Sequence, residues 1–167
     1  MRTAVVILNW NGVIHLQTYL PSVIEFSSQD NVEIWVIDNG STDQSCSWLR
    51  SNYPSIKLVK LDKNYGFAGG YNRGINEITA DRYILLNSDV RVSEGWIDLT
   101  AETMSSMSLS ACAPLVLSDL SPSLYDHAGA AGGYIDKDGF VFCAGRMFNR
   151  FESVENYGED KEVFWAS

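Results

Sequence analysis

The stretch AVVILN at residues 4–9 decides the fold, because it is an apolar run that leaves no polar face. Three further runs are equally short, rich in β-branched residues and followed by polar or turn residues: VEIWVID (32–38), IKLVKL (56–61) and RYILLN (82–87). Runs of this kind are typical of strands buried on both faces, as in parallel sheets. We therefore predict four buried strands.

Segments with helical periodicity separate these strands. Apolar residues share one helical face before the second strand and another before the fourth: Val13, Leu16, Leu20, Val23 and Ile24, then Phe67, Tyr71, Gly74, Ile75 and Ile78. Pro21 is expected to kink or restart the first helix. Ser41 and Gln44 have the spacing of a capping box, which predicts another helix that runs to about Tyr53. This alternation predicts an α/β fold with a Rossmann-type, mainly parallel sheet flanked by helices.

The pattern changes in the last third of the chain. We expect a helix from Gly95 to about Met107 and then a strand, ACAPLVL (111–117). The following segment is rich in glycine and aromatic residues, and Asp138-Gly139 predicts a hairpin turn. We therefore assign residues 1–110 to a ligand-binding α/β part and 111–167 to a mixed second region. That region is expected to be incomplete, because the chain stops on a strand-like segment without a polar tail.

Composition narrows the class of protein. Of the 167 residues, 46% are apolar and 20% are charged, as in an ordinary globular domain. The net charge of −9 argues against nucleic-acid or anionic-membrane binding across the whole surface. The three cysteines are far apart and are expected to be reduced thiols, and no stretch is long enough to span a membrane. We expect a cytoplasmic protein, which leaves room for peripheral association with the inner face of the membrane.

Polar side chains follow all four predicted strands. The segments are Asn9-Trp10-Asn11-Gly12, Asp38-Asn39-Gly40-Ser41, Asp62-Lys63-Asn64 and Asn87-Ser88-Asp89. Ligands of open parallel sheets bind beyond the carboxyl ends of the strands, where carboxylates can bind a hard cation or accept hydrogen bonds from a nucleoside. Each loop alone is compatible with an ordinary turn. All four together predict a ligand site.

The glycine-rich stretch NYGFAGGYNRG at residues 64–74 fits neither the dinucleotide fingerprint nor the P-loop. Two interpretations stay open: the glycines let a helix start tightly and pack close to the sheet, or they admit a ligand. Asn72 and Arg73 could reach phosphate or ribose from the first turns of that helix.

Four motifs, in this order and spacing, resemble the nucleotide-sugar-binding half of family 2 glycosyltransferases of GT-A fold: VVILNWNG, VIDNGSTD, NYGFAGGYNRGI and LLNSDV. The resemblance covers roughly residues 3–117 and is greatest for the rhamnosyltransferase-like subgroup. It implies an enzyme of cell-wall or polysaccharide synthesis that takes a sugar from a UDP-, dTDP- or GDP-sugar. The implied acceptor is a saccharide or a lipid-linked molecule, and no nucleic-acid partner is implied.

The resemblance also implies roles for individual residues. Asn9 would contact the nucleotide, Asp38 would accept from the base N3–H, and Asn64 would help to hold the base and ribose. Asp89 would bind Mg²⁺ or Mn²⁺ with Asn87 nearby, although Asn87 stands where the family more often has aspartate. The complete expected nucleotide-binding set is Asn9, Asn11, Asp38, Ser41, Asn64, Gly66, Gly69, Gly70, Asn72, Asn87 and Asp89.

The implied reaction inverts the anomeric carbon by direct displacement and requires a carboxylate base. The acidic motif at 157–160 resembles the base motif of the family, but it leads into a strand-like segment, so we expect a charged surface loop there. The base is then expected beyond Ser167, and this chain alone would transfer little or no sugar.

Other candidate residues have simpler explanations. His15 is expected at the surface, whereas His127 keeps a possible site role. Asp43 is explained by a helix start. Asp136 and Asp138 are expected in the hairpin, and Trp10 in a pocket wall or the core rather than as a stacking platform.

Two other functions stay open at this point. The first is a non-catalytic nucleotide-binding or scaffolding domain in which the NSD sequence is only a turn. The second is a sugar nucleotidyltransferase, which would need a glycine-rich, basic loop after the first strand. The loop at residues 9–12 contains no arginine or lysine.

Overall fold

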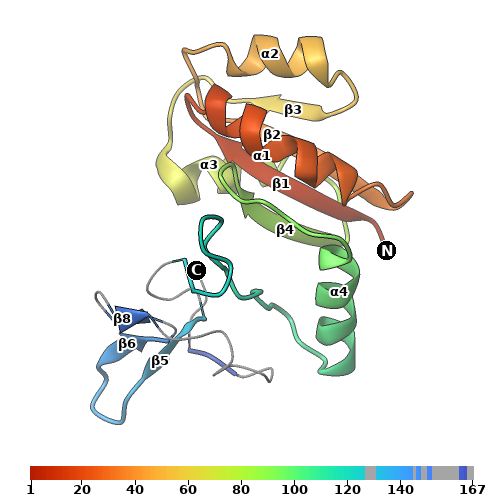
Figure 1. Ribbon diagram of the computed structural model, residues 1–167. Coiled ribbons are helices and arrows are strands. Elements are labelled where there is room, and N and C mark those ends of the chain that lie inside the picture. Colours follow the sequence, from red (N-terminus) through yellow and green to blue (C-terminus); the bar gives the residue numbers. More distant parts are fainter. Residues whose placement is uncertain (127–130, 145, 148–149, 152–161, 165–167) are drawn as a thin grey trace. The chain divides into compact units, whose positions relative to one another are not determined.

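The computed structural model describes residues 1–126, 131–144, 146–147, 150–151 and 162–164 (Figure 1). The chain forms two compact units, Met1–Trp96 and Ile97–Ser167. The functional division expected at residue 110 stays a prediction. No helix in the described part of the chain is long and apolar enough to cross a membrane.

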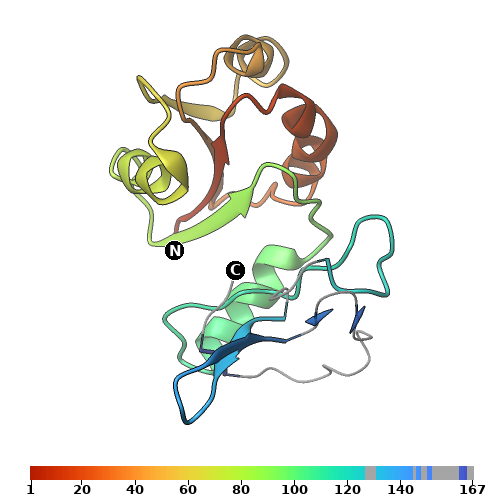
Figure 2. The ribbon, with the colours of Figure 1, turned by 90° about the vertical axis from the view of Figure 1, so that its left-hand side faces the viewer.

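The first unit contains the predicted parallel sheet. Its elements in chain order are β1 (Thr3–Asn9), α1 (Val13–Glu25), β2 (Val32–Asp38), α2 (Ser45–Asn52), β3 (Lys57–Lys60), α3 (Gly66–Ile75) and β4 (Arg82–Asn87). The strands lie in the order β3-β2-β1-β4, and every pair is parallel. Figure 2 shows α1 and α3 on opposite faces of this sheet. The α/β fold and the four strands are therefore confirmed.

Strand β1 is the centre of the core because both of its faces are covered. Ala4 and Val6 are fully buried and belong to a cluster with Ile37 and Tyr71. The alternate residues of β1 point to the other face, and they are buried as well. The Tyr71 hydroxyl donates a 3.0 Å hydrogen bond to the carbonyl oxygen of Leu86, which ties α3 to β4. Because both faces of β1 are buried, its sequence needs apolar residues at successive positions and not only at alternate ones.

Two local expectations in the first unit need correction, the restart at Pro21 and the capping box at Ser41, whereas the kink at Pro21 stays a prediction. Helix α1 runs through Pro21 without a restart, since it is continuous from Val13 to Glu25. Ser41 does not cap α2: that helix begins at Ser45 and its N-cap residue is Gln44, which makes no side-chain capping bond. The Ser41 hydroxyl instead accepts hydrogen bonds from the preceding β1–α1 loop.

The second unit contains α4 (Trp96–Ser106, which begins at the boundary) and two small antiparallel sheets, β5 (Gly133–Ile135) with β6 (Val141–Cys143) and β7 (Arg146–Met147) with β8 (Arg150–Phe151). Helix α4 was predicted, and so was the hairpin turn, where Gly139 has φ +90°. The strand predicted at 111–117 was wrong. Within the described residues this segment makes a single antiparallel bridge, between Leu117 and Tyr125, and Pro114 lacks the N–H that a ladder needs.

Candidate functional site

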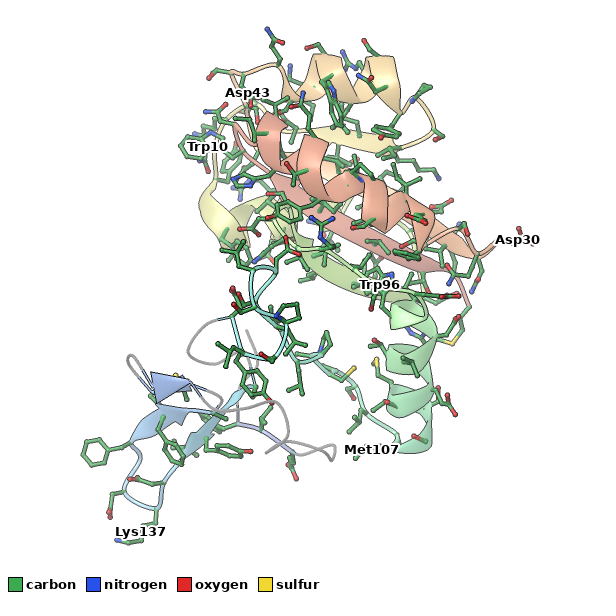
Figure 3. All side chains as sticks on the ribbon, in the orientation of Figure 1. Trp10, Asp30, Asp43, Trp96, Met107 and Lys137 are labelled. Atoms are coloured by element: carbon green, nitrogen blue, oxygen red, sulfur yellow. The ribbon has the colours of Figure 1, made fainter. Side chains whose placement is uncertain are left out.

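A pocket of about 320 Å³ lies at the carboxyl ends of the strands. Its described lining residues come from all the strand-end loops: Leu8, Trp10, Asn39, Asn64, Gly66, Phe67, Asn87, Ser88 and Asp89. In Figure 3, Trp10 and Asp43 lie at this end of the first unit and Asp30 lies at the other. The pocket is therefore where ligands of open parallel sheets bind.

The lining combines aromatic rings with amide and carboxylate oxygens. Trp10 is 56% exposed and Phe67 is 64% exposed, so both rings present large apolar surfaces to solvent beside the pocket. Among the described residues that line it, Asp89 is the only one that carries a charge. An anionic ligand would therefore meet no lysine or arginine there.

The end of β4 offers oxygen atoms that fit a hard divalent cation. Ser88 and Asp89 form a turn directly after Asn87, and all three residues line the pocket. Carboxylate and amide oxygens are the ligands that Mg²⁺ and Mn²⁺ prefer, and a site with one carboxylate takes its remaining ligands from water and substrate phosphates. The described part of the chain holds no cluster of three or more His, Cys, Asp or Glu side chains suited to a metal.

Asn9 and Asp38 form a buried pair beside the pocket. Both residues are fully buried, and Asn9 Nδ2 donates to Asp38 Oδ1 at 3.2 Å and to Ser41 Oγ at 3.2 Å. The backbone N–H of Ser41 donates to Asp38 Oδ2 at 3.1 Å. Both Asp38 oxygens thus accept hydrogen bonds within the protein, so the pair joins β1 to the loop after β2.

Cys46, at the start of α2, lies near the same carboxylate. Burial raises the pKa of the Cys46 thiol to about 11, and a hydrogen bond to Asp38 and the charge of Asp38 add to the effect.

Asn11 and Asp43 lock the β1–α1 loop to the β2–α2 loop. Asn11, at φ +50°, accepts hydrogen bonds at its Oδ1 from the backbone N–H of Thr42 (2.8 Å) and of Asp43 (3.2 Å). Asp43 accepts at Oδ2 from Val13 N and at Oδ1 from Ser45 N, both at 3.0 Å. Burial opposes ionisation of Asp43, but the hydrogen bonds from Ser45 and Val13 outweigh it and lower the pKa of the carboxyl. The Asp43 carboxylate therefore accepts a hydrogen bond from the first backbone N–H of α1 and another from the first backbone N–H of α2.

Asn39, which belongs to a predicted strand-end segment but not to the expected nucleotide-binding set, connects the β3–α3 loop to the end of β2 by hydrogen bonds. It is 2% exposed, and its Nδ2 donates to Asn64 Oδ1 and to the carbonyl oxygen of Gly66, each at 3.0 Å. Its Oδ1 accepts from Tyr65 N at 3.0 Å. Gly40 permits the close approach of this loop, because a Cβ there would lie 2.5 Å from the backbone of Lys63.

The glycines of α3 mainly serve packing. A Cβ on Gly74 would lie 2.2 Å from Ile37 Cδ1, and one on Gly70 would lie 2.8 Å from Leu8 Cδ1. Gly66 has φ +71° and lines the pocket. Gly70 and Gly74 therefore fit the packing interpretation, because without a Cβ they let α3 approach the sheet closely.

The structure divides the predicted nucleotide-binding residues into three groups. Asn64, Gly66, Asn87 and Asp89 line the pocket. Asn9, Asn11, Asp38 and Ser41 form the loop-locking network beside it. Gly69, Gly70 and Asn72 lie on α3 and are absent from the lining, and Asn72 is exposed.

Phe67 and Asn39 also line the pocket but were not in the expected nucleotide-binding set. Phe67 was missed because its spacing placed it on the apolar face of the predicted helix. Asn39 was missed although it follows Asp38 directly.

The structure describes some of the other candidate residues, and the rest lie outside its described part. His15 is exposed, as expected, and stacks on Tyr19. Asp136 is a hairpin residue, because its Oδ1 accepts from Asp138 N and Phe140 N, each at 2.9 Å. Trp10 is in the pocket wall and not in the core. His127 and the acidic motif at 157–160 lie outside the described residues.

A larger pocket, of about 630 Å³, lies along β3. Its described lining is Trp35, Leu58, Val59, Lys60, Leu61, Arg73, Asn76 and Glu77. Arg73, which we expected could reach phosphate or ribose, is among them, but no residue of the complete expected nucleotide-binding set is. The smaller pocket, which the strand-end loops enclose, is therefore the candidate site.

Comparison with known proteins identifies the family. The family model of Glycosyl transferase family 2 matches residues 4–158. N-acetylglucosaminyl-diphospho-decaprenol L-rhamnosyltransferase of Mycobacterium tuberculosis is 26% identical over an alignment of 145 residues, and the match covers 80% of this chain and 41% of that protein. The uncharacterized glycosyltransferase YfnE of Bacillus subtilis is 29% identical over 104 residues, 61% of this chain and 26% of its own.

Solved structures show the same fold. The mannosyltransferase PcManGT from Pyrobaculum calidifontis, in complex with GDP-Man and Mn²⁺, has a TM-score of 0.56 at 20% identity over 69% of this chain and 33% of that chain. TarS from S. aureus in complex with UDP-GlcNAc has a TM-score of 0.53 at 21% identity, over 64% of this chain and 32% of that chain. The chain therefore spans less than half the length of each of these relatives.

Proposed function

The chain belongs to glycosyltransferase family 2, and on that premise we propose that its pocket binds the nucleotide-diphosphate part of a sugar donor with the help of a divalent cation. The observation that carries this proposal is the position of Asp89, the single charged side chain among the described pocket residues, at the end of β4. Family membership also decides against the nucleotidyltransferase alternative.

The pocket suits a nucleoside diphosphate in its chemistry. The exposed rings of Trp10 and Phe67 are available to the nucleoside, and the Asp89 carboxylate provides an oxygen ligand for Mg²⁺ or Mn²⁺. Bound there, the cation would neutralise the charge that grows on the departing diphosphate. Because the described lining contains no lysine or arginine, we expect donor binding to depend strongly on the cation.

The residues of this chain have distinct roles in the proposal. Asp89 holds the cation, and Asn87 orients the ligand beside it. Asn9, Asp38 and Asn11 hold the strand-end loops in place through the hydrogen bonds described above. In the whole protein a carboxylate base takes the proton of the acceptor hydroxyl while that oxygen displaces the diphosphate with inversion.

The names of the relatives guide the finer assignment. The mycobacterial relative is named for rhamnosyl transfer to a lipid-linked acceptor, and we propose the same class of reaction for the whole protein. The donor would be a UDP-, dTDP- or GDP-sugar and the pathway cell-wall or polysaccharide synthesis, at the cytoplasmic face of the membrane.

Calorimetric titration with UDP, dTDP and GDP, each with and without Mn²⁺, tests the proposal. We expect one nucleotide to bind in a Mn²⁺-dependent manner and the Asp89→Asn variant to lose at least tenfold in affinity, about 1.4 kcal/mol. Asp30→Asn is the matched control, because Asp30 is exposed at the opposite end of the unit (Figure 3). Binding that is indifferent to both Mn²⁺ and Asp89→Asn would instead support a non-catalytic nucleotide-binding domain.

A further inference from the structure

The hydrogen bonds around Asn39 determine which way two carboxamides face. A backbone N–H can only donate, so the atom that accepts from it must be the oxygen of the amide. Tyr65 N donates to Asn39 at 3.0 Å, and Gly66 N donates to Asn64 at 2.7 Å. These two bonds identify Oδ1 in both side chains, and Asn39 Nδ2 is therefore the atom that donates to Asn64 Oδ1 at 3.0 Å.

These hydrogen bonds leave only the Nδ2 group of Asn64 available to a ligand in the pocket. Its Oδ1 accepts two hydrogen bonds, from Gly66 N in the same loop and from Asn39 Nδ2 at the end of β2, which use both of its lone pairs. Asn64 is exposed and lines the pocket. Its Nδ2 group, with two N–H donors, is the part of the side chain that is left for a ligand.

We propose that Asn39 is a positioning residue that holds the Asn64 carboxamide with its N–H donors toward the pocket, so that this wall selects an acceptor oxygen of the nucleoside. The assignment rests on the proposed function. Asn39 itself is 2% exposed and acts through Asn64.

The position of Asn64 favours the nucleoside over the diphosphate. Asn64 is hydrogen-bonded to Asn39, which lies at the end of β2, whereas Asp89 lies just after the end of β4. In the order β2-β1-β4 these ends are two strand spacings apart, about 10 Å. Phe67, with its exposed ring, lies three residues after Asn64. A diphosphate bound at Asp89 would therefore extend its nucleoside toward Asn64.

A double-mutant cycle tests whether Asn39 acts through Asn64. Asn39→Asp has nearly the same shape and still accepts from Tyr65 N, but it can donate neither to Asn64 Oδ1 nor to the carbonyl oxygen of Gly66. We expect Asn39→Asp and Asn64→Ala each to weaken binding of the nucleoside diphosphate that the wild type binds best by about tenfold, the value of one good hydrogen bond. The double variant should bind within twofold of Asn64→Ala, because the second change removes nothing further.

Titration with inorganic pyrophosphate and Mn²⁺ separates the nucleoside from the phosphates. Both single variants should bind pyrophosphate within twofold of the wild type. An equal loss for pyrophosphate and nucleotide would overturn the assignment to the nucleoside. Additive losses in the cycle would show that Asn39 does not act through Asn64 and would overturn the proposal.

A second variant keeps the test valid if Asn39→Asp does not fold. Asn64→Asp changes an exposed residue, retains an oxygen for Gly66 N and Asn39 Nδ2, and replaces the N–H donors by an acceptor. We expect nucleotide affinity to fall tenfold or more, and unchanged affinity would refute the inference. If the wild type binds none of UDP, dTDP and GDP, the proposed function itself fails; a wild type that binds while the variants behave like it overturns only the role of Asn39.

Discussion

Replacing Gly74 by alanine tests how α3 is held against the sheet. An added Cβ would lie 2.2, 2.5 and 2.7 Å from the Cδ1, Cγ1 and Cγ2 atoms of Ile37. Carbon atoms in contact are ordinarily 3.5–4.0 Å apart, so Ile37 or the helix must move by about 1 Å or more. Ile37 is fully buried in β2 and is β-branched, which leaves it few alternative rotamers.

The expected cost follows from two opposing effects. Overpacking a well-packed core costs about 1–3 kcal/mol, and three close atoms on a rigid partner place Gly74→Ala at the upper end. Alanine regains about 1 kcal/mol relative to glycine in a helix. We therefore expect the free energy of unfolding to fall by about 2 kcal/mol.

Urea unfolding followed by far-UV circular dichroism measures this change. With a slope of about 2 kcal/mol per molar urea, the midpoint should fall by about 1 M. Asn72→Ala is the control: it lies on the same helix but is exposed, so its effect should stay within about 0.5 kcal/mol. If Gly74→Ala were as stable as the wild type while the control behaved as expected, the close packing of α3 on Ile37 would be refuted.

Three further predictions concern Gly40 in a loop of the site and Cys46 on α2. Gly40→Ala should lower the free energy of unfolding by more than 1 kcal/mol, because Gly40 has φ +74° and its Cβ would meet the Lys63 backbone at 2.5 Å; an unchanged urea midpoint would contradict that packing. The pKa of the Cys46 thiol rises from 9.0 to about 11 on folding. The free energy of unfolding should therefore be unchanged below pH 9 and fall as the pH rises toward 11. Cys46→Ala should remove this part of the fall. Iodoacetamide at pH 8.5 should alkylate the exposed Cys143 before Cys46, and mass spectrometry that found the reverse order would oppose the raised pKa.

The parallel sheet was predictable because its signal is local. Residues 4–9 have no polar face, and a short run rich in β-branched residues is typical of a strand that is covered on both sides. The strand predicted at 111–117 failed because the same signal says nothing about pairing. An apolar run becomes a strand only where another backbone offers hydrogen bonds to it.

The site was predictable as a place but not as a set of contacts. Strand ends fall at one edge of a parallel sheet, so the sequence alone determined that Asn64, Asn87 and Asp89 would gather there. Whether a polar residue beyond a strand faces the pocket or a neighbouring loop depends on groups far away in the chain. Asp38 and Asn39 are adjacent, yet Asp38 bonds to Asn9 and Ser41 whereas Asn39 reaches Asn64. Those partners are brought together only by the order of the strands, and so the tertiary structure alone decided which residues line the site and which hold it in place.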